Sequence, residues 1–161
     1  MDTSNPSSSS HQWKHHVFLS FRGEDTRKSF TDHLHTALKR EGVITFRDKE
    51  NLERGKPISL ELLKAIEESL SAIVILSRNY ASSTWCLDEL VKIMECREKK
   101  GLIVLPIFYD VDPFEVRKQM GSYAKAFIKH GKNFKNINKV RTWKATLTEV
   151  ANLAGFSLQD R

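Results

Sequence analysis

Residues 72–90 read AIVILSRNYASSTWCLDEL, and the fold follows from this stretch. Its continuous apolar run at 72–76 is typical of a central parallel strand that is covered on both faces. After a polar break, Ser83 or Thr84 is suited to cap a helix. The apolar positions then recur at helical spacing: Leu87, Leu90, Val91 and Met94. The stretch therefore predicts a buried strand that passes through a loop into an amphipathic helix.

Trp85 and Glu89 lie one turn apart at the start of this helix, and so on a shared face. The helix begins just beyond the C-terminal end of a strand, which is the edge where open parallel sheets bind ligands. An indole can stack on a base while a carboxylate meets a ribose, so the pair suits a nucleotide. From the residues alone, two plainer interpretations stay open: Glu89 as an acid that complements the helix dipole, and Trp85 as a core aromatic.

Strand and helix patterns alternate along the rest of the chain. Strands are predicted at 16–21, 43–46, 72–76 and 102–108, and helices at 29–40, 58–69, 84–100, 114–130 and 139–154. The 114–130 segment is interrupted at Gly121, Gly155 is expected to cap the last helix, and Pro106 is expected to bend its strand or place it near an edge. The connector before the last helix has room for a very short further strand around Phe134. Charged turns are expected at 22–27 and 48–55.

This alternation predicts a flavodoxin-like, three-layer α/β domain at 13–161, with a parallel sheet of about five strands and helices on both faces. Residues 1–12 are Ser-rich and polar, and are expected to be disordered. The length of 161 residues and the apolar content of 40% fit one soluble domain. No segment has the apolar length of a signal peptide or membrane span, so no membrane partner is expected. The two cysteines do not form a disulfide framework, which favours a reducing cytoplasm or nucleus.

The net charge of +6 is concentrated in one part of the chain. No acid occurs between Glu115 and Glu149, whereas nine basic residues do: Arg117, Lys118, Lys125, Lys129, Lys132, Lys135, Lys139, Arg141 and Lys144. This stretch could contact nucleic acid or an acidic protein face, or form a solvated surface.

Several familiar signatures are absent from the sequence. There is no GxGxxG or GxxxxGK[ST], which argues against an ordinary dehydrogenase or NTPase. There is also no HExxH and no GxSxG, and the cysteines have no metal-ligand spacing. No metal site is expected.

Several long motifs, in order, resemble plant Toll/interleukin receptor (TIR) domains: FLSFRGEDTR at 18–27, TFRD at 45–48 with LERG at 52–55, AIEES at 65–69, YASSTWCLDEL at 80–90, PIFYDVDP at 106–113 and VRKQMG at 116–121. The resemblance covers about 16–156. The chain resembles the N-terminal module of a plant nucleotide-binding leucine-rich-repeat immune receptor. Because no nucleotide-binding or repeat segment follows Arg161, an excised domain or a TIR-only protein is expected.

The resemblance implies a self-association-dependent enzyme that hydrolyses NAD⁺ at the nicotinamide–ribose bond. Its ADP-ribose-type products would be signals for plant immunity and cell death, in chemistry similar to that of ADP-ribosyl cyclases. By position in the motifs, Glu89 is the catalytic residue, and the 48–57 loop closes over the ligand. NAD⁺ is then a substrate, and no cofactor is expected. The substrate pocket is expected to include Trp85, Arg22, Gly23, Cys86, Lys49 and Ile58.

Some of these positions also have plainer interpretations. Arg22 and Gly23 end the first strand at the ligand-binding edge, but they could equally belong to a loop with an Arg–Asp surface pair. Cys86 suits a small buried hydrophobe. In some relatives the matching cysteine is tied to a 2′,3′-cyclic nucleotide synthetase that acts on nucleic acid, so nucleic acid stays open as a partner.

Two self-association surfaces follow by analogy. On the first helix, relatives often carry Ser-His, and here the pair is Asp32-His33. The second surface is formed by 114–130 and the last helix, where Lys118 lies near Gly121, and Gly121 permits close approach. An exposed Phe114 ring would favour an interface there. A non-catalytic scaffold that signals by TIR–TIR contact is therefore a second candidate function.

Overall fold

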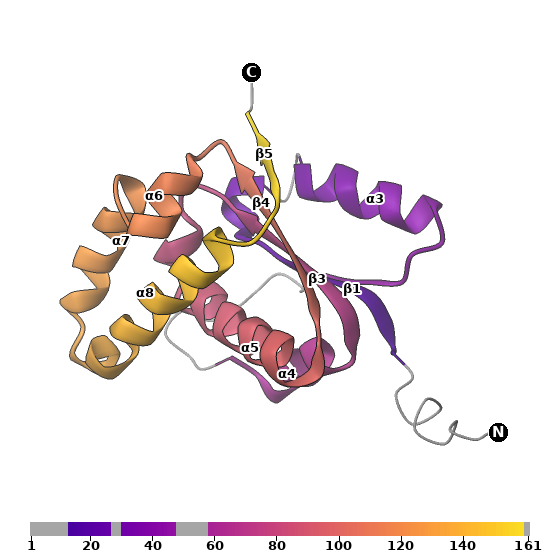
Figure 1. Ribbon diagram of the computed structural model, residues 1–161, viewed down its shortest axis with the longest axis horizontal. Coiled ribbons are helices and arrows are strands. Elements are labelled where there is room, and N and C mark those ends of the chain that lie inside the picture. Colours follow the sequence, from indigo (N-terminus) through magenta and orange to yellow (C-terminus); the bar gives the residue numbers. More distant parts are fainter. Residues whose placement is uncertain (1–12, 27–29, 48–57, 160–161) are drawn as a thin grey trace.

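A five-stranded sheet, parallel throughout, organises the domain (Figure 1). The computed structural model describes residues 13–26, 30–47 and 58–159. The expectations for 1–12, for the 48–57 loop and for Lys49 lie outside these residues. The strand order is β2-β1-β3-β4-β5. The strands are β1 (His15–Ser20), β2 (Thr45–Arg47), β3 (Ser69–Leu76), β4 (Ile103–Tyr109) and β5 (Phe156–Leu158).

Helices cover both faces of the sheet, as the flavodoxin-like prediction requires. They are α2 (Gly23–Thr26), α3 (Asp32–Arg40), α4 (Leu60–Glu67), α5 (Thr84–Lys100), α6 (Pro113–Lys118), α7 (Ser122–Gly131) and α8 (Ile137–Ala151), with 3₁₀ turns η2 (Tyr80–Ser82) and η3 (Phe134–Asn136). Alternate residues of β1 face opposite layers, because successive side chains of a strand point to opposite sides. Leu19 packs with Leu34 and Leu38 of α3, whereas Phe18 belongs to the larger core with α4, α5 and α8.

The predicted boundaries of α5 are confirmed at both ends. The Ser83 hydroxyl accepts a hydrogen bond from the Cys86 backbone N–H at 3.1 Å, and Gly101 ends the helix with a left-handed φ of 75°. Such a cap satisfies an amide that the helix itself leaves unpaired. The strand–loop–helix unit at 69–100 therefore forms as the sequence predicts, with β3 in the middle of the sheet.

Three expectations were wrong: the place of the fifth strand, the turn after β1 and Gly155 as the cap of the last helix. Phe134 lies in the 3₁₀ turn η3, and the fifth strand is instead β5, after the last helix. The predicted turn after β1 contains the one-turn helix α2. Gly155 does not cap α8, which ends at Ala151. It lies against Pro106 instead, where an added Cβ would approach the Pro106 carbonyl oxygen to 2.2 Å.

None of the described helices is long and apolar enough to cross a bilayer.

Candidate functional site

Glu89 lies at the carboxyl edge of the sheet, where α5 begins after β3. Its side chain faces inward, and the residue is 3% exposed. Ser20, the last residue of β1, donates its hydroxyl hydrogen to Glu89 Oε1 at 2.9 Å. The parallel register sets Ser20 opposite Val74 of β3, so the end of β1 lies close to the start of α5. A buried carboxylate needs such donors, because burial removes its hydration.

Tyr80 extends this buried network. Its hydroxyl oxygen lies 2.7 Å from Ser20 Oγ and 3.2 Å from the Cys86 carbonyl oxygen. Because Ser20 donates its one hydrogen to Glu89, the single phenolic hydrogen of Tyr80 is shared between Ser20 Oγ and the Cys86 carbonyl oxygen. Burial raises the pKa of Tyr80 well above its ordinary value, and the nearby Cys86 and Glu89 act in the same direction. The phenol therefore stays protonated and holds the Ser20 hydroxyl in position.

Asp25 of α2 binds the loop that follows β3 at the same edge. Its carboxylate accepts hydrogen bonds from Ser77 Oγ at 2.6 Å and from the backbone N–H and side-chain amide of Asn79 at 2.9 and 3.2 Å. The Tyr123 hydroxyl donates to the Ser77 carbonyl at 2.7 Å. These bonds connect α2, the segment after β3 and α7, so the surroundings of Glu89 are rigidly supported.

Trp85 lies in the first turn of α5, half-buried against the main core. The core interpretation is therefore correct for part of its surface. Its indole Nε1 is buried and has no hydrogen-bond partner within the described residues, and the same holds for Nε of Arg22. Unpaired buried donors are rare in folded proteins. These two N–H groups are candidate ligand contacts at the edge that carries Glu89.

Arg22 and Gly23 follow β1 after one residue, Phe21, and Gly23 begins α2. The Arg22 guanidinium pairs with Glu24 at 2.9 Å, so the expected Arg–Asp pair is in fact an Arg–Glu pair. Cys86 is buried in the main core, and its thiol donates to the Phe21 carbonyl at 3.5 Å. Cys86 thus packs as a small buried hydrophobic residue, which is one of the two roles expected from the sequence.

Ile58 lies apart from the residues around Glu89. It lines a groove of about 330 Å³ between α4, α5 and α8 whose other described residues are Leu63, Asp88, Val91, Lys92, Glu95 and Lys139. Glu89 and Trp85 are not among them. In the described part of the chain, no cluster of His, Cys, Asp and Glu side chains could hold a metal ion.

Asp88, next to Glu89, points toward α8. Its carboxylate accepts a hydrogen bond from Trp143 Nε1 at 3.0 Å and lies 3.5 Å from the Lys139 ammonium. Neighbouring carboxylates of one helix thus contact β1 on one side and α8 on the other.

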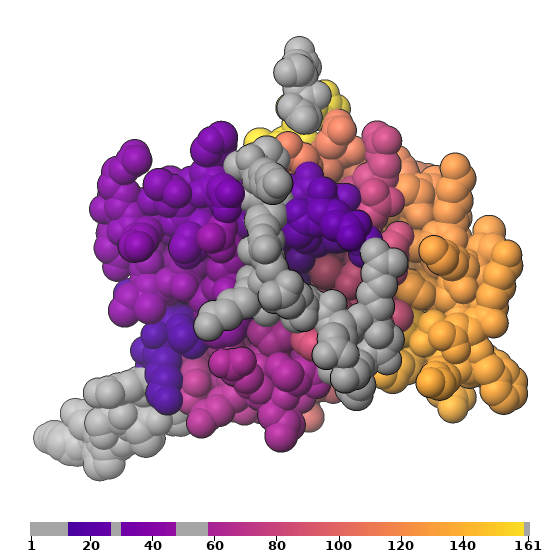
Figure 2. Space-filling model, turned by 180° about the vertical axis from the view of Figure 1, so that it is seen from behind, coloured from indigo at the N-terminus to yellow at the C-terminus, as the bar shows by residue number. Residues whose placement is uncertain are grey.

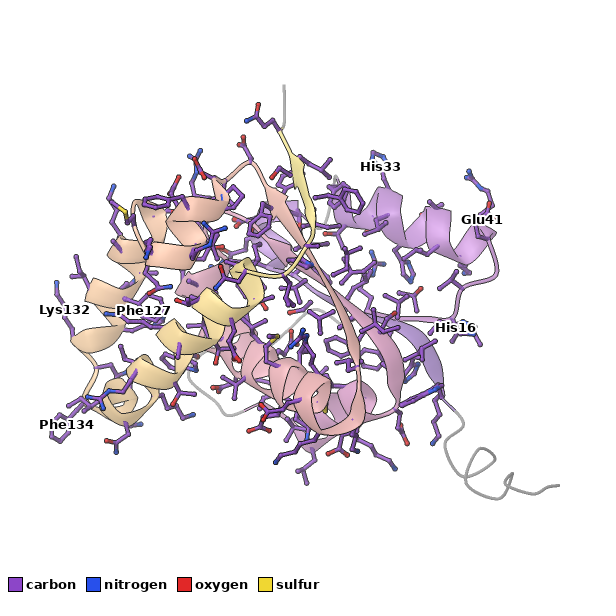
Figure 3. The ribbon with its side chains drawn as sticks, in the orientation of Figure 1. His16, His33, Glu41, Phe127, Lys132 and Phe134 are labelled. Carbon is purple, nitrogen blue, oxygen red and sulfur yellow. The ribbon has the colours of Figure 1, made fainter. Side chains whose placement is uncertain are left out.

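The self-association residues fall on two separate surfaces. Figure 2 shows the purple α3 region and the orange α7–α8 region on opposite sides of the molecule. On α3, Asp32 forms a salt bridge with Arg47 of β2, while His33 is exposed and points outward (Figure 3). On α6, Lys118 is exposed and Phe114 is 48% exposed.

Gly121 separates α6 from α7 with φ of 57°. A Cβ at this position would lie 2.2 Å from Glu115 Oε2. The glycine is therefore required by its own turn, in addition to any role in contact with a second molecule.

Sequence reasoning missed Ser20, Tyr80 and Asp25. Ser20 is the single polar residue within the apolar run 17–21, and such a buried hydroxyl needs a partner. That signal could have marked it. Tyr80 and Asp25 stand in polar segments, where their sequence context gives no comparable sign.

The fold and the acid at its sheet edge define a flavodoxin-like α/β domain with a candidate ligand site. The family model described as TIR domain matches residues 14–161, and the chain belongs to the TIR domain family. Disease resistance protein RUN1 of Vitis rotundifolia is 60% identical over 147 residues, which are 89% of this chain and 11% of that protein. TMV resistance protein N of Nicotiana glutinosa is 55% identical over 150 residues, which are 92% of this chain and 13% of that protein. The chain thus spans a small part of each relative.

Solved structures agree. The TIR domains of the activated Roq1 resistosome, which directly recognizes the pathogen effector XopQ, match with a TM-score of 0.84 and 57% identity over 90% of this chain and 88% of that chain. The TIR domain heterodimer of RPS4 and RRS1 shares the fold, with a TM-score of 0.50 and 21% identity over 90% of this chain and 82% of that chain.

Proposed function

We propose that this domain is a self-association-dependent NAD⁺ hydrolase that cleaves the nicotinamide–ribose bond, with Glu89 as the catalytic residue. The observation that carries the proposal is the position of Glu89, a buried acid held by Ser20 at the ligand-binding edge of a parallel sheet. The products would act as nucleotide signals in plant immunity and cell death.

One carboxylate suffices for this reaction. Loss of nicotinamide gives an oxocarbenium-like ribose, and a carboxylate beside the ribose stabilises the developing positive charge. Nicotinamide leaves as a neutral molecule from a cation, so a strong general acid is not required. Ser20 and Tyr80 fix the carboxylate, while the buried, unpaired N–H groups of Trp85 and Arg22 would meet a dinucleotide once neighbouring segments move.

Self-association explains how substrate reaches the acid. Because Glu89 is 3% exposed in the single chain, a dinucleotide would meet it only after neighbouring segments move. We infer that contact with a second TIR domain stabilises the open arrangement, so that the activity per molecule rises with protein concentration.

The test measures NAD⁺ consumption and nicotinamide release at increasing protein concentration. Glu89→Gln keeps the size of the side chain and removes its charge, and should lower the rate by at least about a hundredfold. Glu98→Gln is the matched control, because Glu98 is an exposed acid on the same helix. A Glu89→Gln protein with the wild-type rate would refute the assignment.

A non-catalytic scaffold is the second candidate, and the exposed His33 and Phe114 favour it. In a plant cell-death assay, a scaffold keeps its activity in Glu89→Gln and loses it in His33→Ala or Phe114→Ser. Large side chains at Gly121 are poor probes of an interface, because they first strain the turn between α6 and α7.

A further inference from the structure

Three apolar side chains are exposed where α7 turns through η3 into α8. Phe134 is 86% exposed, Ile128 65% and Ile137 53%. Figure 3 shows Phe134 and Lys132 at the periphery, pointing away from the body, whereas Phe127 lies between the helices. We call the segment 125–137 the α7–α8 corner. Three exposed apolar side chains within one short segment indicate a surface that meets another molecule.

Four lysines alternate with these apolar residues along the same segment of the chain. Lys125, Lys129, Lys132 and Lys135 are all exposed, and none forms a salt bridge within residues 13–26, 30–47 and 58–159. Lys139 is set apart from them, because it lies beside Asp88. The sequence from 116 to 148 contains no acid to offset this charge.

Hydrogen bonds and a ring contact fix the backbone of the α7–α8 corner. The Asn133 side chain accepts a hydrogen bond from the Lys135 backbone N–H at 2.9 Å, which fixes the start of η3. The Asn136 amide donates to the His130 carbonyl at 3.3 Å. The His130 ring packs against Trp143 with a centroid distance of 5.3 Å. Phe134 therefore stays outside the core because the local backbone is fixed, and it pays little further ordering cost on binding.

The chemistry of this surface selects its occupant. Isoleucine side chains cannot stack on bases, so two of the three apolar groups have no role on a nucleic acid. Exposed apolar side chains interspersed with exposed, unpaired lysines match a bilayer interface, where apolar groups enter between headgroups and lysines meet acidic lipids. We propose that the α7–α8 corner docks the domain on an anionic membrane surface, with Phe134, Ile128 and Ile137 entering the interfacial layer.

The test is cosedimentation of the full chain with vesicles of phosphatidylcholine alone or of equimolar phosphatidylcholine and phosphatidylserine. We expect binding to the anionic vesicles that weakens as salt rises. Phe134→Ala should lower the partition coefficient roughly tenfold, since it removes a large apolar side chain that the bilayer would bury. Each of Lys132→Glu and Lys135→Glu should lower it by at least about fivefold.

Matched controls lie elsewhere on the surface. Phe156→Ala changes a phenylalanine that is 61% exposed on β5, and Lys39→Glu changes an exposed lysine on α3. Both should bind anionic vesicles like the wild type. In a Phe134→Trp variant, lipids with brominated acyl chains should quench the added fluorescence.

Two outcomes would overturn the proposal. One is equal or absent binding to neutral and anionic vesicles. The other is duplex DNA binding that depends on Lys132 and Lys135, together with vesicle binding that Phe134→Ala leaves unchanged. The second outcome would assign the surface to nucleic acid.

Discussion

Ser20→Ala isolates the contribution of one hydroxyl to the candidate site. The substitution removes the 2.9 Å hydrogen bond to Glu89 and the hydrogen bond between the Ser20 and Tyr80 hydroxyls. A hydrogen bond to a charged group contributes about 1.5–3 kcal/mol. If the bond holds the carboxylate where charge develops in the transition state, its loss should lower the NAD⁺ cleavage rate by roughly ten- to a hundredfold.

Ser69→Ala is the control for stability. Ser69 is 1% exposed, as against 0% for Ser20, and its hydroxyl donates to the Ala65 carbonyl at 2.7 Å. It lies at the start of β3, at the opposite edge of the sheet from Glu89. Both variants should lose about 1–3 kcal/mol of unfolding free energy.

The assay combines urea unfolding with NAD⁺ consumption at a protein concentration where the wild type is active. Ser20→Ala alone should lose rate, mainly in kcat, because Ser20 acts through Glu89 and does not bind substrate. Equal rates for Ser20→Ala and Ser69→Ala would refute the argument that Ser20 positions the acid.

Two further predictions concern stability. Gly155→Ala should lose about 1–3 kcal/mol of unfolding free energy, because its Cβ would approach the Pro106 carbonyl oxygen to 2.2 Å. Gly131→Ala is the control, since its Cβ would meet no atom within 4 Å and its stability should be nearly unchanged. Thermal melting of the two variants distinguishes these outcomes. The hydrogen bond from Lys92 holds the pKa of Glu67 below its ordinary value. This partly exposed pair should contribute at most about 1 kcal/mol above the unfolded-state pKa of Glu67. That contribution should disappear as pH falls through the lower folded pKa. Lys92→Gln should remove this part of the acid dependence of Tm; an unchanged profile would contradict the assignment.

The sequence predicts those parts of the fold where burial on two faces leaves an apolar run. β1, β3 and β4 are found in this way, and α5 by its periodicity and caps. β5 escapes because all three of its residues are exposed. The start of β2 is shifted, because the Val43 N–H bonds to the Leu38 carbonyl at the end of α3 and does not join the sheet.

The sequence predicted the position of Glu89, but not the residues that hold its carboxylate in place. Glu89 is found from its place at a helix start beyond a strand. The contact with Ser20 joins positions 69 apart in sequence and depends on strand register, which no local pattern specifies. The motif resemblance identifies the family but gives no sign of which neighbours hold the acid.

The contact between Asp88 and Trp143 has a mechanical consequence. Helix α5 cannot roll about its axis without breaking either this bond or the one that Ser20 makes to Glu89. Any displacement of α8 that pulls on Asp88 also displaces Glu89, which is the next residue in the chain. Contact of another molecule with the outer end of α8 would therefore shift the Glu89 carboxylate through Asp88.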